Sequence, residues 1–383
     1  MMTSEVLFWL SFVFIFYAYF GYPLMLMTVS IFRKHPIERG DIVPNVSFII
    51  TAYNEEKNIA RKIENTLALD YPRGKLEIIV ASDSSSDRTD DIVMSYRSQG
   101  VILVRAPERK GKENAQRYAV GVSSGEIFVF SDVATILQPD GLRNIAKNFH
   151  DQTVGCVSSI DKFIDKDGKI SGEGAYVKYE MFLRKLETKV NSLVGLSGSF
   201  FAARREVCQH WATDLQSDFN TLINSVKLGS RGVLDPHSIG YYENITDDKK
   251  EFERKVRTVL RGITVFMKSL PMLNPFKYGL FSWQLFSHKL CRWLVPFAML
   301  LLLISNISLV YYQATHLKAY TSLLLIQIVF YATAITGSLN KTFSSNIFIR
   351  IPAFFVTVNI SIVIAWLKYL KGIRAVSWEP SRR

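Results

Sequence analysis

Apolar and polar residues divide this chain into long uncharged ends and a mixed-polarity middle. Residues 6–32 contain no charged side chain, and three more uncharged stretches follow late in the chain, at 294–317, 319–340 and 351–367. A helix needs roughly 20 mainly apolar residues to cross a bilayer. The first three stretches reach that length and the fourth is marginal, so we expect membrane helices towards both ends.

The middle of the chain alternates between short apolar runs and stretches with helical periodicity. The apolar runs predict four buried strands, at residues 46–52, 76–81, 101–104 and 125–130. Asn54 is expected to cap the first of the helices between them. This alternation predicts an α/β fold, with a Rossmann-like and mostly parallel sheet that has helices on both faces.

Three turns that follow these strands carry acidic side chains, at 53–55, 82–87 and 131–134. Ligands of parallel sheets bind beyond the carboxyl ends of the strands, so these turns are the expected site. Asp83 could accept a hydrogen bond from a nucleobase imide or a ribose hydroxyl. Asp132 could hold Mg²⁺ or Mn²⁺ against a diphosphate. The plainer alternative for both is a solvated acid in a turn.

The first apolar stretch is interpreted as an anchor, with a cleaved signal peptide as the alternative. It has no basic segment before it, exceeds the ~7–15-residue apolar core of a signal peptide, and lacks a small-residue cleavage site. Arg33 and Lys34 follow it, which favours a cytosolic middle region in a multi-pass protein of the cell membrane. Cys156, Cys208 and Cys291 are scattered, as expected in a reducing compartment.

The formal charge of +12 comes from 46 basic and 34 acidic residues. Many of the basic residues flank apolar stretches: Arg33, Lys34, Lys289, Arg292, Lys368, Lys371 and Arg374. This distribution suits the anionic lipids of a membrane surface. The sequence has no zinc-finger, recognition-helix or aromatic RNA-binding signature, so we expect membrane lipids and no nucleic acid as partners.

Three motifs in a fixed order resemble those of glycosyltransferase family 2. They read TAYNEE at 51–56, VASDSSSDRT at 80–89 and FSDVAT at 130–135. The resemblance extends over roughly residues 46–261, and the membrane flanks are similar to those of polysaccharide-forming members. It implies a GT-A fold that transfers a sugar from a nucleotide-diphosphate donor, often with a divalent metal.

The resemblance implies donor-binding roles for six residues, one of which, Asp132, is also the expected metal ligand. Thr51, Tyr53 and Glu55 belong to the first motif, whose aromatic residue lies beside the nucleotide base. Asp83 matches the base-binding aspartate of the family. Lys112 matches a basic segment near the donor phosphates, and its alternative is a solvated charge before a helix.

Asp132 matches the first acid of the family's D-x-D metal motif, but Ala134 stands at the second position. One carboxylate is a poorer metal site than two. The diphosphate and waters can complete the coordination of Mg²⁺ or Mn²⁺, since Mg²⁺ usually keeps several waters. The alternative is weak metal dependence or none.

Residues 195–204 resemble the glycine-containing segment that lines the family's acceptor site, and Gly195, Ser197 and Gly198 are the expected acceptor-binding positions. Small residues let a sugar approach the backbone closely. The same segment is also typical of a tight turn before a buried strand. These two interpretations of the segment are compatible with one another.

Asp218 falls where the family has its acidic catalytic motif. Inverting sugar transfer needs a base that takes the proton of the attacking hydroxyl, and a carboxylate can serve. Asp214 is the second candidate, and a helix cap is the alternative role for Asp218. Ser217 stands where many members carry a further acid.

Arg257 matches the arginine of the family's Q-x-x-R-W segment and is expected to stabilise charge on the leaving diphosphate. Arg254 and Thr258 stand at the glutamine and tryptophan positions. That tryptophan is associated with processive synthases, so its absence favours transfer of single sugars. The alternative for the arginines is a basic face on lipid headgroups.

These observations predict four parts: an N-terminal anchor (1–36), a cytosolic GT-A domain (45–260), interfacial amphipathic helices (261–290), and C-terminal membrane helices with a basic tail (291–383). Three spans after a cytosolic domain place the C-terminus outside, whereas the tail, including Arg382 and Arg383, favours the inside. We therefore expect one apolar stretch to be re-entrant or interfacial, with 351–367 the weakest span.

The expected function is that of a membrane-bound inverting glycosyltransferase, which moves a sugar from a nucleotide-diphosphate donor, a UDP-sugar, to a lipid-linked or polysaccharide acceptor. Proteins of polysaccharide assembly are further expected partners. The alternative is a catalytically silent scaffold subunit of such an assembly. The absence of acids at Ala134 and Ser217 favours this alternative.

Overall fold

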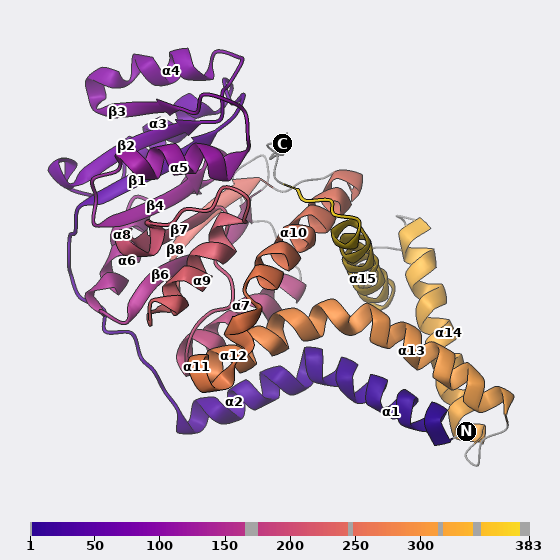
Figure 1. Cartoon of the computed structure of the whole chain (residues 1–383). Helices are drawn as coiled ribbons and strands as arrows, with labels where there is room; N and C mark the ends of the chain where they lie inside the picture. Colours follow the sequence, from indigo (N-terminus) through magenta and orange to yellow (C-terminus); the bar gives the residue numbers. More distant parts are fainter. Residues whose placement is uncertain (1, 165–174, 244–247, 313–316, 340–345, 376–383) are drawn as a thin grey trace. The chain divides into compact units, whose positions relative to one another are not determined.

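The computed structural model describes residues 2–164, 175–243, 248–312, 317–339 and 346–375 (Figure 1), so Arg382 and Arg383 lie outside the described residues. The chain forms two compact units. The α/β unit contains Leu26–Thr246 and Thr264–Ser282, and the helical unit contains Met1–Met25, Asp247–Ile263 and Trp283–Arg374.

An eight-stranded sheet with the order β3-β2-β1-β4-β7-β6-β8-β5 forms the core of the α/β unit (Figure 1). Its strands are β1 (Val46–Ala52), β2 (Leu76–Ser82), β3 (Val101–Arg105), β4 (Ile127–Asp132), β5 (Ile136–Leu137), β6 (Val154–Ile164), β7 (Phe200–Arg204) and β8 (Arg231–Glu243). Strands β3, β2, β1 and β4 are parallel, as are β6 and β8, whereas β7 is antiparallel to both of its neighbours. The mostly parallel α/β sheet predicted from the sequence is confirmed.

Helices cover both faces of this sheet. They are α3 (Ile59–Leu67), α4 (Thr89–Ser95), α5 (Lys112–Val122), α6 (Gly141–Lys147), α7 (Ala175–Val190), α8 (Arg205–Cys208) and α9 (Ser217–Lys227). Phe48 and Ile50 of β1 pack with Ile59 and Ile63 of α3 in one buried cluster. Full burial of such side chains contributes roughly 1.5–3 kcal/mol each. Helix α5 contacts β1, β2 and β3 without joining this cluster, so it covers the opposite face.

The strand register brings the three predicted turns to one edge of the sheet. Thr51 of β1 lies opposite Ala81 of β2 on one side and opposite Asp132 of β4 on the other. Because the three strands are parallel neighbours, the turns that follow them share the carboxyl edge.

Asn54 does not cap the helix that follows it, so that prediction is wrong. Helix α3 begins at Ile59, four residues later than a cap at Asn54 would place it, and its N-terminal flanking residue is Asn58. Asn54 instead has a left-handed φ of 51° and hydrogen-bonds to the second turn. The reason is tertiary, because its side chain finds a partner across the edge of the sheet.

Among the described residues, the remaining helices include four runs that are long and apolar enough to cross a membrane: Met2–Phe32, Leu280–Tyr311, Leu317–Leu339 and Ile347–Leu370. They contain α1 (Met2–Phe16), α2 (Tyr22–Phe32), α12 (Leu280–Leu285), α13 (Arg292–Tyr311), α14 (Leu317–Leu339) and α15 (Ile347–Leu370). The fourth run has 24 residues and is as apolar as the second. It is longer than the sequence indicated, because Arg350 and Lys368 lie inside the helix and do not end it.

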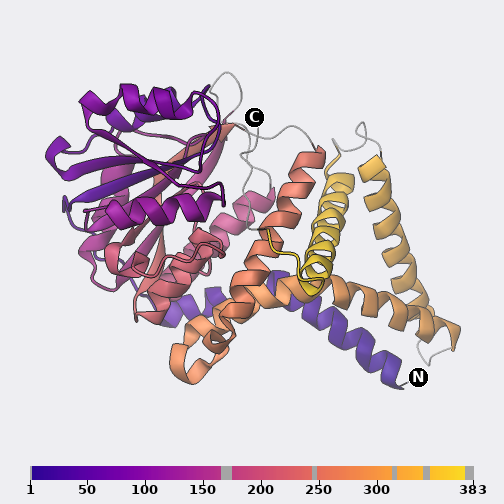
Figure 2. The ribbon, with the colours of Figure 1, turned by 45° about the horizontal axis from the view of Figure 1, so that its top comes forward.

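Within the helical unit, α1 packs along α13 (Figure 2). The first two runs each contain a π-helical segment, at Tyr17–Gly21 and Phe286–Cys291. These segments meet through the Tyr17 hydroxyl, which lies 2.6 Å from Ser287 Oγ and accepts a hydrogen bond from Trp283 Nε1 at 2.9 Å. The hydrogen bonds join two apolar helices with polar groups satisfied inside the unit.

The link between the two units is α10 (Asp248–Lys268), followed by the short helices Leu270–Leu273 and α11 (Pro275–Tyr278). Helix α10 runs without a break through residue 260, where the sequence suggested a domain boundary. The four-part division of the chain stays a prediction.

Candidate functional site

Hydrogen bonds of the Asn54 side chain join the first two turns at the carboxyl edge. Asn54 and Ser84 both have left-handed φ values, of 51° and 54°, which are uncommon outside glycine. The Asn54 side chain accepts a hydrogen bond from the Ser86 backbone N–H at 2.8 Å and donates one to Ser86 Oγ at 3.1 Å. This pairing offsets the backbone strain and preforms the edge.

Two of the predicted donor-binding residues make local contacts here. Thr51 is buried, and its hydroxyl accepts a hydrogen bond from Gln116 Nε2 at 3.2 Å. The Glu55 backbone N–H donates to Thr89 Oγ1 at 2.8 Å, and its carboxylate accepts from Asn58 at 3.1 Å. These contacts stabilise the turns, and the roles of Thr51 and Glu55 in donor binding stay predictions.

Asp83 is fully buried at the end of β2 and holds the loop that leads into α5. Its carboxylate accepts hydrogen bonds from the backbone N–H groups of Lys110, at 3.1 Å, and Gly111, at 2.9 Å. Gly111 makes this geometry accessible because its φ is 99°, a region that favours glycine. Burial raises the pKa of Asp83, while the two N–H donors act in the opposite direction.

Tyr53 lies in the turn after β1 with the Arg109 guanidinium 4.0 Å from its ring centroid. Stacking of this kind joins a cation to an aromatic face. The pair places a flat surface and a positive charge in the turns beside Asp83, the position predicted for the nucleotide base.

Lys112 is the first residue of α5 and is only 7% exposed. Its ammonium forms an ion pair with Asp132 and donates a hydrogen bond to the carbonyl of Gly198 at 3.0 Å. The side chain is therefore not the solvated charge that the alternative interpretation describes. It joins a predicted donor residue to the predicted acceptor segment.

Lys62 of α3 is a site residue that sequence reasoning missed. It is fully buried, and its ammonium donates to Ser131 Oγ at 2.8 Å and to the Thr135 carbonyl at 2.6 Å. Burial lowers the pKa of Lys62 to about 7, although the negative charge of Asp132 opposes this shift. Two amines, of Lys62 and Lys112, thus flank the turn that carries Asp132.

Replacing Lys62 with Met is expected to change how stability depends on pH. The pKa of Lys62 is lower in the folded than in the unfolded chain, so the unfolded state binds the extra proton between about pH 7 and 10. The free energy of unfolding of the wild type should therefore rise by about 2 kcal/mol more between pH 7 and 9 than that of Lys62→Met. Denaturant unfolding at both pH values measures this. Exposed Lys57→Met is the control, and identical pH dependence in Lys62→Met would contradict the assignment.

Asp161 of β6 is a second residue that sequence reasoning missed. Its carboxylate accepts hydrogen bonds from the hydroxyls of Ser197, at 2.7 and 2.8 Å, and of Ser199, at 2.5 Å. Burial raises the pKa of Asp161, and the two serine hydroxyls counteract this. The acid therefore orients the glycine-containing segment, and a single acid in a strand has no local motif that marks it.

Gly198 lies against Asp218 at the start of α9. A Cβ atom on Gly198 would be 2.9 Å from Asp218 Oδ2, so the Asp218 side chain would have to shift if residue 198 carried one. Asp218 itself accepts hydrogen bonds from the Phe219 N–H at 2.8 Å and from Gln216 Nε2 at 3.1 Å. Gly195, the first residue of the segment, accepts a hydrogen bond from Arg184 through its carbonyl at 2.9 Å.

Replacing Gly198 with Ala is expected to reduce activity strongly, because the new methyl group displaces Asp218 or the Gly198 carbonyl that Lys112 contacts. A misplacement of about 1 Å can cost roughly 10²-fold in rate. Turnover of the purified variant measures this, with a circular dichroism spectrum as the folding control. The exposed Gly74→Ala, where no atom lies within 4 Å of the new methyl group, should retain wild-type activity. Wild-type turnover in Gly198→Ala would contradict the placement.

Asp214 and Arg257 are the other two residues that the sequence suggested for catalysis. Asp214 is exposed and forms an ion pair with Lys268. Arg257 lies on the part of α10 that belongs to the helical unit, as does Arg254, which pairs with Glu251 at 2.7 Å. The catalytic role of Arg257 stays a prediction.

The fit of a divalent metal depends on Asp132. Within the described parts of the chain, no group of three or more His, Cys, Asp or Glu residues is placed to hold a metal ion. Ala134 supplies no ligand, and the Asp132 carboxylate is shared with Lys112. One carboxylate fits Mg²⁺ or Mn²⁺ only when diphosphate oxygens and waters provide the other ligands.

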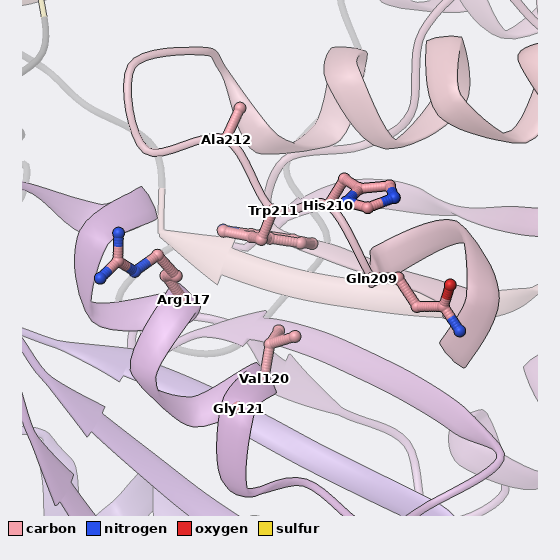
Figure 3. A pocket seen from close by; sticks show the side chains of 7 residues that line it. All are labelled: Arg117, Val120, Gly121, Gln209, His210, Trp211 and Ala212. Atoms are coloured by element: carbon pink, nitrogen blue, oxygen red, sulfur yellow. The ribbon is translucent and has the colours of Figure 1, made fainter.

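A hollow of about 540 Å³ lies between α5 and the segment that follows α8 (Figure 3). It is lined by Arg117, Val120, Gly121, Gln209, His210, Trp211 and Ala212. Trp211 stacks on Phe130 with ring centroids 4.6 Å apart. None of the predicted site residues lines this hollow, so we assign the site to the carboxyl edge of the sheet.

Comparison with known proteins identifies the α/β unit. The model of the family described as glycosyl transferase family 2 matches residues 47–211, which include the three turns and the first turn of α5. The chain carries a glycosyl transferase family 2 domain. The predicted resemblance is confirmed, and the site cluster lies in this domain and in the residues directly after it.

Relatives of this glycosyl transferase family 2 domain include a glycolipid synthase and a polysaccharide synthase. The poly-beta-1,6-N-acetyl-D-glucosamine synthase of Staphylococcus aureus (strain COL) is 27% identical over 208 residues, which cover 52% of this chain and 49% of the relative. The beta-monoglucosyldiacylglycerol synthase of Trichormus variabilis is 25% identical over 195 residues, which cover 49% and 42%. The chain thus spans about half the length of these relatives or less.

A solved structure extends the likeness beyond the glycosyl transferase domain. The mannosyltransferase PcManGT from Pyrobaculum calidifontis, in complex with GDP-Man and Mn²⁺, superimposes with a TM-score of 0.72 and 22% identity. The match covers 95% of this chain and 99% of that one. It confirms the expected fold, a GT-A sheet together with membrane-type helices.

Proposed function

We propose that this chain is a membrane-bound inverting glycosyltransferase that moves single sugars from a UDP-sugar to a lipid-linked or glycan acceptor. The observation that supports this most directly is the position of Gly198. Its carbonyl accepts a hydrogen bond from Lys112, and its α-carbon lies against Asp218. Predicted donor, acceptor and base residues therefore converge at one edge of the sheet.

On the donor side, the base is proposed to stack beside Tyr53 and Arg109 and to contact Asp83. The Asp83 carboxylate, which holds the Lys110 and Gly111 N–H groups, is the acceptor for a base imide. Lys112 is proposed to neutralise the diphosphate. An ammonium that is mostly excluded from water interacts more strongly with phosphate than a solvated one does.

Mg²⁺ or Mn²⁺, when bound, would be held by Asp132 and would neutralise charge on the donor diphosphate. Lys112 shares the Asp132 carboxylate, so it provides positive charge at the same place. We therefore propose a metal dependence that is partial and not absolute. The mannosyltransferase structure contains GDP-Man and Mn²⁺, so GDP- and UDP-sugars, each with Mn²⁺, are the first ligands to test.

Asp218 is proposed to act as the general base. Its carboxylate takes the proton from the acceptor hydroxyl as the hydroxyl oxygen bonds to the anomeric carbon, and the bond from that carbon to the diphosphate oxygen breaks. Attack from the face opposite the diphosphate inverts the anomeric centre. Arg257 is proposed to stabilise the negative charge on the leaving diphosphate.

The acceptor is proposed to reach Gly195, Ser197 and Gly198 from a membrane. Four candidate membrane helices and relatives named as glycolipid and polysaccharide synthases support a lipid-linked or glycan acceptor. Arg33 and Lys34 after the first helix support a cytosolic site in a multi-pass protein, with further assembly proteins as partners. Thr258 in place of tryptophan supports transfer of single sugars.

Donor binding by the purified full-length chain tests this proposal. We expect UDP-sugars to raise the melting temperature, and Mn²⁺ to increase this shift without being required for it. UDP-N-acetylglucosamine, UDP-glucose and GDP-mannose are the probes, each with Mn²⁺ or with EDTA. A shift with GDP-mannose alone would replace the proposed nucleotide. No shift with any probe would contradict the enzyme and favour a scaffold.

A further inference from the structure

The first turn of α5 carries a buried acid, Glu113, that the proposed chemistry does not use. Its side chain is only 2% exposed, next to Lys112 in the sequence. Glu113 Oε1 accepts hydrogen bonds from the Ser217 backbone N–H at 3.3 Å and from the Ser217 hydroxyl at 3.4 Å. A buried carboxylate destabilises the fold unless it gains hydrogen-bond partners such as these. The contacts between Glu113 and Ser217 are therefore part of how the site folds.

The residue that Glu113 holds is the first of α9, and Asp218 is the second. The first N–H groups of a helix have no partner within the helix and carry partial positive charge. These N–H groups stabilise the Glu113 carboxylate, which comes from another helix. The carboxylate in turn fixes the start of α9. Asp218 therefore takes its position from a contact made one residue earlier.

The backbone of Glu113 is itself fixed on the other side. Trp211 donates a hydrogen bond from Nε1 to the Glu113 carbonyl at 3.1 Å and stacks on Phe130 of β4. The loop before α5 is held by Asp83 through Gly111. Glu113 thus projects from a helix end that is anchored to two strands of the sheet.

Lys112 and Glu113 are consecutive residues of α5 that contact different parts of the site. Lys112 contacts Asp132 and Gly198, and Glu113 contacts Ser217. A shift of the first turn of α5 would move the donor-side ammonium and the start of α9 together. This connection links the donor residues to the residue that is proposed to deprotonate the acceptor.

We propose that Glu113 is a positioning residue for Asp218, which it holds in place through the first residue of α9. This inference rests on the proposed function of Asp218 as the base. It assigns Glu113 no contact with the donor, so loss of its charge should affect transfer and not donor binding.

Glu113→Gln in the full-length chain tests the proposal, because glutamine keeps the size and an acceptor oxygen but removes the charge. We expect the kcat for sugar transfer to a membrane lipid fraction to fall about tenfold or more, since small displacements of a base are costly. The Kd for the donor and the melting temperature should stay close to those of the wild type. Glu108→Gln is the matched control, because Glu108 lies in the same segment, is exposed, and forms an ion pair with Lys110.

Wild-type kcat in Glu113→Gln would overturn the proposal. Equal losses of kcat and donor binding would also overturn it, because they indicate a general structural role.

Amide hydrogen exchange provides a readout that needs no turnover. In Glu113→Gln, the amides of residues 217–220 should exchange faster than in the wild type and in Glu108→Gln. Unchanged exchange there would overturn the inference even if the wild type transfers sugar. Faster exchange in a chain that transfers no sugar would contradict the proposed function and leave the contact between Glu113 and α9 established.

Discussion

Asp218→Asn is expected to lower sugar transfer by about 10²–10⁴-fold, the usual contribution of a general base. The amide has nearly the same shape and keeps an acceptor for the Phe219 N–H, so the start of α9 should remain in place. It cannot take a proton from the acceptor hydroxyl. Donor affinity should stay within about twofold of the wild type, since binding and proton transfer use different groups. Single-turnover transfer and donor titration measure the two effects separately.

Asp214→Asn is the control for this result, because Asp214 is the other acid that the sequence suggested as a base. Asp214 is exposed and pairs with Lys268, so its substitution should leave transfer nearly unchanged. Loss of transfer in Asp214→Asn with full activity in Asp218→Asn would reverse the assignment of the base.

Lys112→Met should raise the Kd for the donor by about 10²-fold. Loss of one partner from a mostly buried charge pair has a cost of this size. The variant removes the cation that is proposed to neutralise the diphosphate, and it leaves the Asp132 carboxylate without its ion pair. Released from Lys112, Asp132 becomes more available to a cation. The remaining donor binding should therefore depend more steeply on Mn²⁺ than that of the wild type.

Lys110→Met tests whether position or overall charge matters. Lys110 lies two residues earlier, is exposed, and pairs with Glu108 at 2.8 Å. Its substitution removes the same charge from the same loop and should change the donor Kd by less than about threefold, as for most exposed ion pairs. Equal losses in both variants would show that Lys112 has no specific role at the diphosphate.

The sheet and its edge could be predicted because their signals are local. Apolar runs such as residues 46–52 and 76–82 form buried strands, and strands of this kind that alternate with helices are typical of parallel sheets. Once the strands are parallel neighbours, the turns after them must share an edge. The order of the strands along the chain therefore predicts one edge for the turns that carry Tyr53, Asp83 and Asp132, and the parallel register of β1, β2 and β4 agrees with it.

The residues that sequence reasoning missed are charged side chains that become buried through contacts distant in the sequence. Lys62 reads as a surface residue of an amphipathic helix, yet it is buried against Ser131 and Thr135. Glu113 reads as a charge near a helix start, yet its partner lies 104 residues later. Periodicity describes one element at a time, so it does not predict which polar positions meet across elements.

Charged residues also made the last membrane helix look shorter in the sequence than it is in the structure. The sequence ended the last apolar stretch at Arg350 and Lys368, whereas α15 continues through both. A long basic side chain can lie along a helix and extend its charge to the interface. Charges near the ends of an apolar run therefore mark membrane boundaries and not helix ends.

The most direct test of a sugar-transferring membrane enzyme is transfer itself. The purified wild-type chain in lipid vesicles is given radiolabelled UDP-N-acetylglucosamine, UDP-glucose or GDP-mannose together with an extracted lipid-linked acceptor fraction. We predict that label from a UDP-sugar enters the lipid phase with an inverted anomeric linkage, and that Asp218→Asn abolishes this. Absence of labelled lipid with every donor, or equal labelling by Asp218→Asn, would contradict the account.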